Sequence, residues 1–119
     1  ALAARLGRVE DLGEVPCLSD TAWDRDWEVW LAAMGAKVAV RGPAFSLYAL
    51  AVEEAVNGAG VLMGHGALVA GHLARGALVA PFPQRVALDR GLRLWSARPV
   101  VKGSAVARVV EFLAQGWLT

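Results

Sequence analysis

The sequence has very little cysteine. Its 119 residues include a single one, Cys17, so no disulfide can form within the chain. One unpaired thiol fits a reducing compartment such as the cytoplasm. Cys17 lies in the apolar run Val15-Pro16-Cys17-Leu18, which favours a core residue over a nucleophile.

Charge is also scarce. Charged residues make up 19% of the chain, against about 25% in an average soluble domain, while 56% of the residues are hydrophobic. Because there are too few charged residues to cover the whole surface, we expect some apolar surface to contact a partner, either a second copy of the chain or a second lobe. The net charge is +1 and the basic residues are scattered, so this chain by itself lacks the basic stripe that DNA binding requires.

One stretch, residues 55–74, contains no Asp, Glu, Lys or Arg. It holds five glycines, two histidines and Asn57, and it lacks the bulky apolar density of a membrane-spanning helix. We therefore expect the end of one helix, a buried strand and the next helix here. The sequence shows no signal peptide, and no membrane association is expected.

Helical and strand patterns alternate along the chain. The expected helices are a short piece at residues 9–12 and longer ones at 23–34, 47–57 and 67–74, with a last helix starting near Ser104. The expected strands are 17–19, 37–41, 61–64, 77–82 and 91–97. Short, wholly apolar strands are typical of parallel sheets covered on both faces. The sequence thus predicts an α/β fold, with a small, mostly parallel sheet flanked by helices.

Tryptophan marks one face of the first long helix. The intervals of four, three, one and three residues place five large apolar side chains together: Trp23, Trp27, Trp30, Leu31 and Met34. This spacing is more typical of a core or interface than of a platform for sugars or bases. Asp20 and Thr21, just before the helix, are suited to cap it.

The last helix carries a second apolar stripe, formed by Val106, Val109, Val110, Leu113 and Trp117. Such a stripe must be covered by something. We expect it to drive self-association of the chain.

Enzyme chemistry has few candidate residues. A hydrolase would recruit Ser46, His65 and an acid such as Asp20, but Pro-Ala-Phe-Ser-Leu lacks the glycines of a nucleophile elbow. Ser46 is instead expected to cap a helix. His65 and His72 have no further ligands at metal spacing, and Gly64-His65-Gly66 lacks the spacing of a phosphate-binding loop. No metal and no cofactor are expected.

Three strand-to-helix junctions are the better candidates for a site: residues 19–21, 41–46 and 64–66. Parallel sheets bind ligands beyond the carboxyl ends of their strands, where helix N-termini present free N–H groups. Arg41 could pair with a carboxylate through two parallel hydrogen bonds. A solvated strand end explains Arg41 equally well.

An ordered series of motifs carries a family resemblance. The series resembles the sensing domain of LysR-type transcriptional regulators, most closely the branch related to the glycine-cleavage activator. It consists of Trp27-x-x-Trp30-Leu31-Ala32-Ala33-Met34-Gly35, Arg41-Gly42-Pro43-x-Phe45, Ala49-Leu50-Ala51-Val52-Glu53-x-Ala55-x-x-Gly58-x-Gly60-Val61, Leu68-Val69-Ala70-x-x-Leu73-Ala74-x-Gly76-x-Leu78-Val79-x-Pro81-Phe82 and the closing stretch 106–118.

The resemblance implies a regulator and not an enzyme. Such regulators combine an N-terminal winged helix-turn-helix with two α/β lobes like those of a periplasmic binding protein. A small effector binds between the lobes and changes the geometry of a DNA-bound oligomer. By this resemblance, residues 1–119 are the second lobe with a terminal return strand and helix, while the winged helix-turn-helix and most of the first lobe lie outside the chain.

The resemblance also places candidate effector-binding residues. They follow three strands: Asp20, Thr21 and Trp23; then Gly42, Pro43, Phe45 and Ser46, with Arg41 beside them; and then Gly64 and His65. The implied effector is a small molecule, with an anion as one candidate. The implied partners are DNA, through the missing domain, and further copies in a cytoplasmic homo-oligomer. A stand-alone binding module and, less favoured, a small serine hydrolase remain as alternatives.

Overall fold

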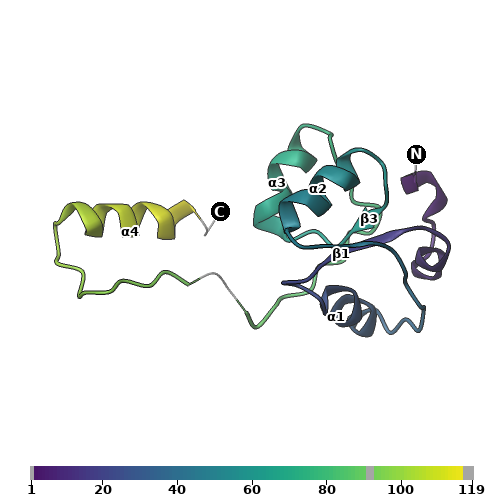
Figure 1. Cartoon of the computed structure of the whole chain (residues 1–119), viewed down its shortest axis with the longest axis horizontal. Helices are drawn as coiled ribbons and strands as arrows, with labels where there is room; N and C mark the ends of the chain where they lie inside the picture. The colour runs from purple at the N-terminus through teal and green to yellow at the C-terminus, as the bar shows by residue number, and fades with distance from the viewer. Residues whose placement is uncertain (1, 91–92, 117–119) are drawn as a thin grey trace. The chain divides into compact units, whose positions relative to one another are not determined.

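The structure, a computed structural model, describes residues 2–90 and 93–116. The chain forms two compact units, Ala1–Val86 and Ala87–Thr119. The first unit contains the sheet and most of the helices, and the second contains helix α4 (Ala105–Gly116) (Figure 1).

The first unit alternates strand and helix after two short 3₁₀ turns. In chain order its elements are η1 (Leu2–Arg5), η2 (Val9–Glu14), β1 (Cys17–Asp20), α1 (Asp26–Ala33), β2 (Ala44–Phe45), α2 (Tyr48–Val56), β3 (Val61–Leu62) and α3 (Gly66–Ala74). The expected helices at 9–12, 47–57 and 67–74 are confirmed within one or two residues at their ends.

The sheet has three strands in the order β2-β1-β3, and both pairings are parallel. Ser19 is opposite Ala44 on one side of β1, and Cys17 is opposite Val61 on the other. The expected α/β class with a small parallel sheet is confirmed.

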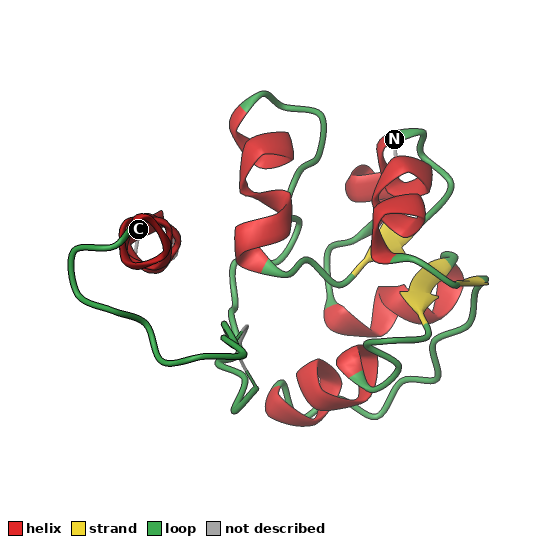
Figure 2. Ribbon diagram, turned by 60° about the vertical axis from the view of Figure 1, so that its left-hand side comes forward, coloured by secondary structure: helices red, strands yellow, loops and turns green. Residues whose placement is uncertain are grey.

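Helices cover both faces of this sheet. Figure 1 shows α1 on one side of β1 and α2 with α3 on the other, and Figure 2 shows the same helices gathered around the short strands. This arrangement follows from topology, because β2 and β3 lie on opposite sides of β1 and right-handed crossovers in opposite directions use opposite faces.

The tryptophan stripe forms the core on the α1 side. Trp27 and Trp30 are less than a tenth exposed and pack with Leu6, Leu12, Val15, Cys17 and Leu31. Each indole N–H finds a backbone partner: Trp27 Nε1 donates to the Leu18 carbonyl at 2.8 Å, and Trp30 Nε1 donates to the Gln84 carbonyl at 3.2 Å. The expectation of a core stripe is confirmed for these residues.

Cys17 belongs to the same core. Its side chain is buried, and its Sγ lies 3.4 Å from the Leu12 carbonyl oxygen. Burial raises the pKa of the Cys17 thiol to about 11, because a thiolate there would lose its hydration. The uncharged thiol supports the interpretation of Cys17 as a core residue.

The strand expected at residues 37–41 is wrong. Residues 36–40 have no regular secondary structure, and Arg41 after them forms an isolated parallel bridge to Pro16. The alternating valines Val38 and Val40 pack against the hydrophobic core instead. Ladder pairing with β1 begins later in the chain, so the strand is Ala44–Phe45.

The strand expected at residues 77–82 is also wrong, because this segment is irregular. Pro81 and Pro83 lack the N–H groups that a ladder needs. Phe82 is held by side-chain packing, with its ring centroid 5.7 Å from that of Trp30. Of the strand expected at 91–97, residues 91–92 lie outside the described residues, and 93–97 do not form a strand.

Two expected helix caps are wrong. Helix α1 begins at Asp26 and not near Trp23, because residues 22–25 form turns, and its N-cap residue is Arg25 rather than Asp20 or Thr21. Helix α2 has Leu47 as its N-cap residue, and Ser46 makes no cap hydrogen bond.

The last helix begins where the sequence predicted. Ser104 Oγ accepts a hydrogen bond from the Ala107 N–H at 3.1 Å, which satisfies one free donor of the first turn. Trp117 of the predicted stripe lies outside the described residues. In the described part of the chain, no helix has the length and apolar character needed to cross a membrane.

Gly42 lies directly against the backbone of the central strand β1. A Cβ built at this position would overlap the carbonyl oxygen of Cys17 and lie 2.7 Å from the Cys17 backbone nitrogen. Since both neighbours are backbone atoms of the central strand, they cannot rotate away.

We therefore expect Gly42→Ala to lower the free energy of unfolding by at least about 2 kcal/mol, measured by urea denaturation. Gly71→Ala is the matched control, because Gly71 lies inside α3 and its added methyl would meet only the flexible Arg75 side chain at 3.4 Å. The control should be neutral or stabilising by up to about 1 kcal/mol. Equal stability of the two variants would contradict the close approach.

Within the second unit, three residues of the apolar stripe of α4 are exposed: Val106 and Val109 are each 56% exposed, and Leu113 is 38% exposed. We expect this face to drive self-association, visible as concentration-dependent sedimentation. Val109→Gln should weaken the association, whereas Arg108→Gln, a neighbouring change off the stripe, should leave it intact. A wild-type chain that remains monomeric at high concentration would contradict this expectation.

Candidate functional site

The carboxyl ends of the three strands meet at one edge of the sheet, called here the carboxyl edge. Asp20 and Phe45 are opposite each other at the ends of β1 and β2, and Gly64 and His65 follow β3. The Thr21 N–H donates to the Phe45 carbonyl at 3.0 Å, which continues the pairing into the loop. The structure thus brings together candidate residues from all three expected junctions.

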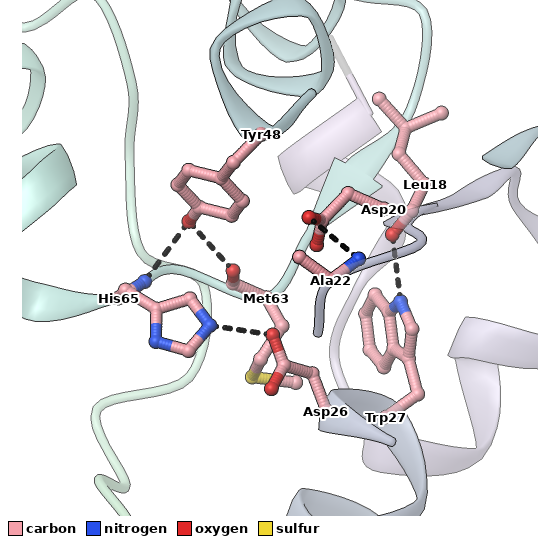
Figure 3. A network of polar contacts seen from close by, with 8 residues as sticks. All are labelled: Leu18, Asp20, Ala22, Asp26, Trp27, Tyr48, Met63 and His65. Carbon is pink, nitrogen blue, oxygen red and sulfur yellow. Dashed lines mark hydrogen bonds and ion pairs between the residues drawn. The ribbon is translucent and has the colours of Figure 1, made fainter. Parts of the chain in front are cut away.

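Asp20 is the buried acid of this edge, only 3% exposed. Its Oδ2 accepts a hydrogen bond from the Ala22 N–H at 3.3 Å, a local turn contact (Figure 3). Because this bond stabilises the turn before α1, Asp20 shapes the path of the loop that carries Trp23.

His65 lies at the centre of the site. Its Nε2 is 2.6 Å from Oδ2 of Asp26, the first residue of α1, and both side chains are about 14% exposed or less. The Trp23 ring lies against the imidazole with a centroid distance of 4.2 Å, and the Tyr48 ring meets it edge-on at 5.3 Å. The ring is therefore held by three elements of the fold.

Tyr48, the first residue of α2, fixes the loop after β3. Its hydroxyl donates to the Met63 carbonyl at 2.9 Å and accepts from the His65 N–H at 3.0 Å (Figure 3). Burial is the main cause that raises the pKa of Tyr48 to about 12, so the phenol stays protonated and can donate. Its role here is to hold the backbone that presents His65.

Asp26 is also perturbed by its surroundings. Burial is the largest effect and raises the pKa of its carboxyl group, while the hydrogen bond from His65 and the charge of His65 oppose the rise. The nearby carboxylates Asp20 and Asp24 raise it further. Asp26 thus depends on His65 for stabilisation of its charge.

Sequence reasoning missed Asp26 and Tyr48. Asp26 lies among charged residues expected on the solvent face of a helix, and Tyr48 lies in a helix start that showed no functional pattern. Only their positions in the sequence could have pointed to them, because each lies a few residues after a predicted strand-to-helix junction: Asp26 after Asp20, and Tyr48 after Phe45 and Ser46.

The hydrolase hypothesis finds no support in this geometry. Ser46 is exposed, and the side-chain hydrogen bond of His65 joins its Nε2 to Asp26 and not to Ser46. The acid paired with His65 is therefore not Asp20, as that hypothesis required. Over the same residues, no group of three or more His, Cys, Asp or Glu side chains could hold a metal ion.

Arg41 and Gly42 lie at the opposite end of the sheet. Arg41 is bridged to Pro16, which precedes β1, and both line a shallow open depression with Gly13, Glu14, Val15 and Gly42. The Pro43 carbonyl accepts the Ser19 N–H at 3.2 Å within the ladder. The structure therefore does not bring Arg41 to the group around His65.

Comparison with known proteins agrees with this architecture. No family model matches the chain. The chain is 34% identical over 100 residues to the HTH-type transcriptional activator AmpR of Rhodobacter capsulatus, a match that covers 82% of this chain but spans only about a third of that protein (34%). Among solved structures, it is similar to the effector domain of the transcriptional regulator AmpR of Pseudomonas aeruginosa, with a TM-score of 0.73 and 22% identity.

The structural match covers 98% of this chain and 57% of that domain. Together the two likenesses confirm the resemblance to the effector-binding domains of LysR-type regulators that the motifs predicted.

Removing the Tyr48 hydroxyl should expose how much it contributes to the site. Tyr48→Phe leaves the Met63 carbonyl and the His65 N–H without their partner, so we expect a loss of about 1–3 kcal/mol in the free energy of unfolding. Ser46→Ala removes a nearby exposed hydroxyl and should change stability by less than about 0.5 kcal/mol. Urea denaturation of both variants tests the difference, and an unchanged Tyr48→Phe stability would contradict the assigned role.

Proposed function

We propose that this chain is the effector-sensing part of a LysR-type transcriptional regulator, and that a small molecule binds at the carboxyl edge against a companion lobe. The observation that supports this most is the convergence of polar and aromatic side chains from three strand ends on His65, in a chain related to AmpR. Ligand sites in parallel α/β sheets lie at such edges.

The proposed binding surface is narrower than the sequence suggested. It comprises Asp20, Thr21, Trp23, Phe45, Ser46, Gly64 and His65, which all lie on the strand ends of the carboxyl edge or the loops that follow them. Gly42 and Pro43 are not placed on this surface. They support it indirectly, because they allow the segment before β2 to pair closely with β1. Arg41 is left out because it lies beyond the other end of β1.

The proposed mechanism converts binding energy into geometry. An effector that contacts both lobes favours a closed arrangement over an open one, by no more than its difference in affinity for the two. No bond is made or broken. DNA binding is assigned to a winged helix-turn-helix outside this chain, in a cytoplasmic homo-oligomer.

The first test is genetic. The coding sequence upstream of Ala1 should encode a winged helix-turn-helix and a first lobe. An intact gene without them would contradict the proposal and favour a stand-alone binding module.

The second test uses the intact regulator in a reporter strain screened with defined small metabolites. Thr21→Val removes an exposed hydroxyl at the carboxyl edge, so the effector concentration for half response should rise about tenfold, as expected for one lost hydrogen bond. Arg75→Gln, at the far end of α3, is the control and should respond normally. DNA affinity without effector should be unchanged in both, and a normal response of Thr21→Val would count against this surface.

A further inference from the structure

The two ring nitrogens of His65 have different surroundings. Nε2 is paired with Asp26, whereas Nδ1 is turned away from it (Figure 3). Among the described residues, no buried side-chain nitrogen or oxygen lacks a hydrogen-bond partner. Since no partner of Nδ1 is found among them, Nδ1 is not fully buried and keeps some surface that a ligand atom can contact.

The partner on Nε2 decides what Nδ1 can do. An ionised carboxylate only accepts hydrogen bonds, so Asp26 requires a hydrogen on Nε2. In a neutral imidazole, the other nitrogen then carries a lone pair and accepts. The 2.6 Å contact between two largely buried side chains is short enough to hold this arrangement.

We infer that Asp26 is a positioning residue that keeps His65 in the tautomer with hydrogen on Nε2, so that Nδ1 accepts a hydrogen bond from the ligand. The ligand group at this position is then a donor, such as a hydroxyl, an amide N–H or an ammonium group, and not a carboxylate. This inference rests on the proposed function only in placing His65 within the ligand site.

The surrounding charges favour the same ligand chemistry. Asp26 and Asp24 lie on the side of α1 and the turn before it, Asp20 lies at the end of β1, and Tyr48 of α2 contributes an uncharged hydroxyl. Arg85 is a cation near the residue after His65, with its Nη1 3.6 Å from the position of a Cβ at Gly66. Arg85 is exposed, so its field is screened by water more strongly than that of the buried Asp20 or of Asp26, whose side chain is 13% exposed.

Rings on two sides keep the imidazole in place. The Trp23 ring lies against the imidazole at a centroid distance of 4.2 Å with a tilt of 38°, Tyr48 meets it edge-on, and the Tyr48 hydroxyl accepts from the His65 backbone N–H. The ring therefore cannot flip without breaking the Asp26 contact. The orientation of Nδ1 is thus set before a ligand arrives, which lowers the entropy cost of recognition.

The tautomer can be measured directly by ¹⁵N NMR of the imidazole nitrogens in the 119-residue chain. The chain has only two histidines, so His72→Gln assigns the His65 signals and leaves the site unchanged. At pH 8 we expect a protonated Nε2 and an unprotonated Nδ1 for His65. A predominant hydrogen on Nδ1 would overturn the inference.

Variants separate positioning from simple structural support. Asp26→Ala should release His65 to a mixture of tautomers, and Asp26→Asn, whose amide N–H can donate to Nε2 where a carboxylate cannot, should also weaken the preference. Asp24→Ala is the matched control, because Asp24 is an exposed carboxylate two residues away without contact to the ring. A tautomer preference that survives Asp26→Ala would overturn the role of Asp26.

Acetamide and acetate form a probe pair of nearly equal shape that tests the ligand chemistry. At pH 8, NMR titration monitored at His65 should show about fivefold tighter binding of acetamide, as expected for one neutral hydrogen bond. Asp26→Ala should remove the difference. Equal binding of the probes, absence of binding or a preference for acetate at pH 8 would overturn the inference.

These measurements need neither DNA nor a companion lobe. If the probes behave as expected but the intact regulator responds to no effector, the proposed function fails and the property of His65 stands. If the regulator responds through Thr21 but the probes show no preference, the proposed function stands and the inference fails.

Discussion

The parallel pairing of β1 on both sides organises the whole first unit. On one side, backbone N–H groups of β1 donate to carbonyls around β2, as in the 2.8 Å hydrogen bond from the Cys17 N–H to the Arg41 carbonyl. On the other side, the Pro16 carbonyl accepts a hydrogen bond from the Val61 N–H of β3. Such close pairing needs backbone without side chains at two positions. A Cβ at Gly42 would overlap Cys17, and a Cβ at Gly60 would lie 2.6 Å from the Pro16 carbonyl oxygen.

This pairing also creates the site. Because all three strands point the same way, the loops that follow them leave the sheet at the same edge. The loop after β1 contains Trp23 and leads to Asp26 at the start of α1. The short loop after β2 leads to Tyr48 at the start of α2, and the loop after β3 contains His65. Three segments that are distant in sequence thus surround one imidazole ring.

The polar contacts at this edge form a connected set. Tyr48 holds the backbone of His65, Asp26 holds one ring nitrogen, and Trp23 covers the ring. Breaking one contact leaves buried polar groups without partners, which costs more than the net contribution of the lost bond. The candidate site is therefore preorganised before any ligand arrives.

Local pattern and composition were enough to predict several elements. The apolar runs predicted β1, β3 and the class of the sheet, helical spacing predicted the buried Trp27 and Trp30, and Ser104 marked the start of α4. The ordered motifs predicted the relation to LysR-type regulators. These features depend on side-chain periodicity, capping and residue identity, which are properties of neighbouring residues along the chain.

Tertiary structure alone decided the rest. The alternation of Val38 and Val40 was compatible with a strand, but a strand exists only where a partner backbone is free to pair. In the parallel register, residues 37–40 fall opposite residues 12–15, most of which belong to the 3₁₀ turn η2 and not to a strand. Likewise, Asp26 and His65 are 39 residues apart, and nothing along the chain marks them as a pair. Long-range contacts of this kind arise from strand order and crossover direction, which local residue patterns do not encode.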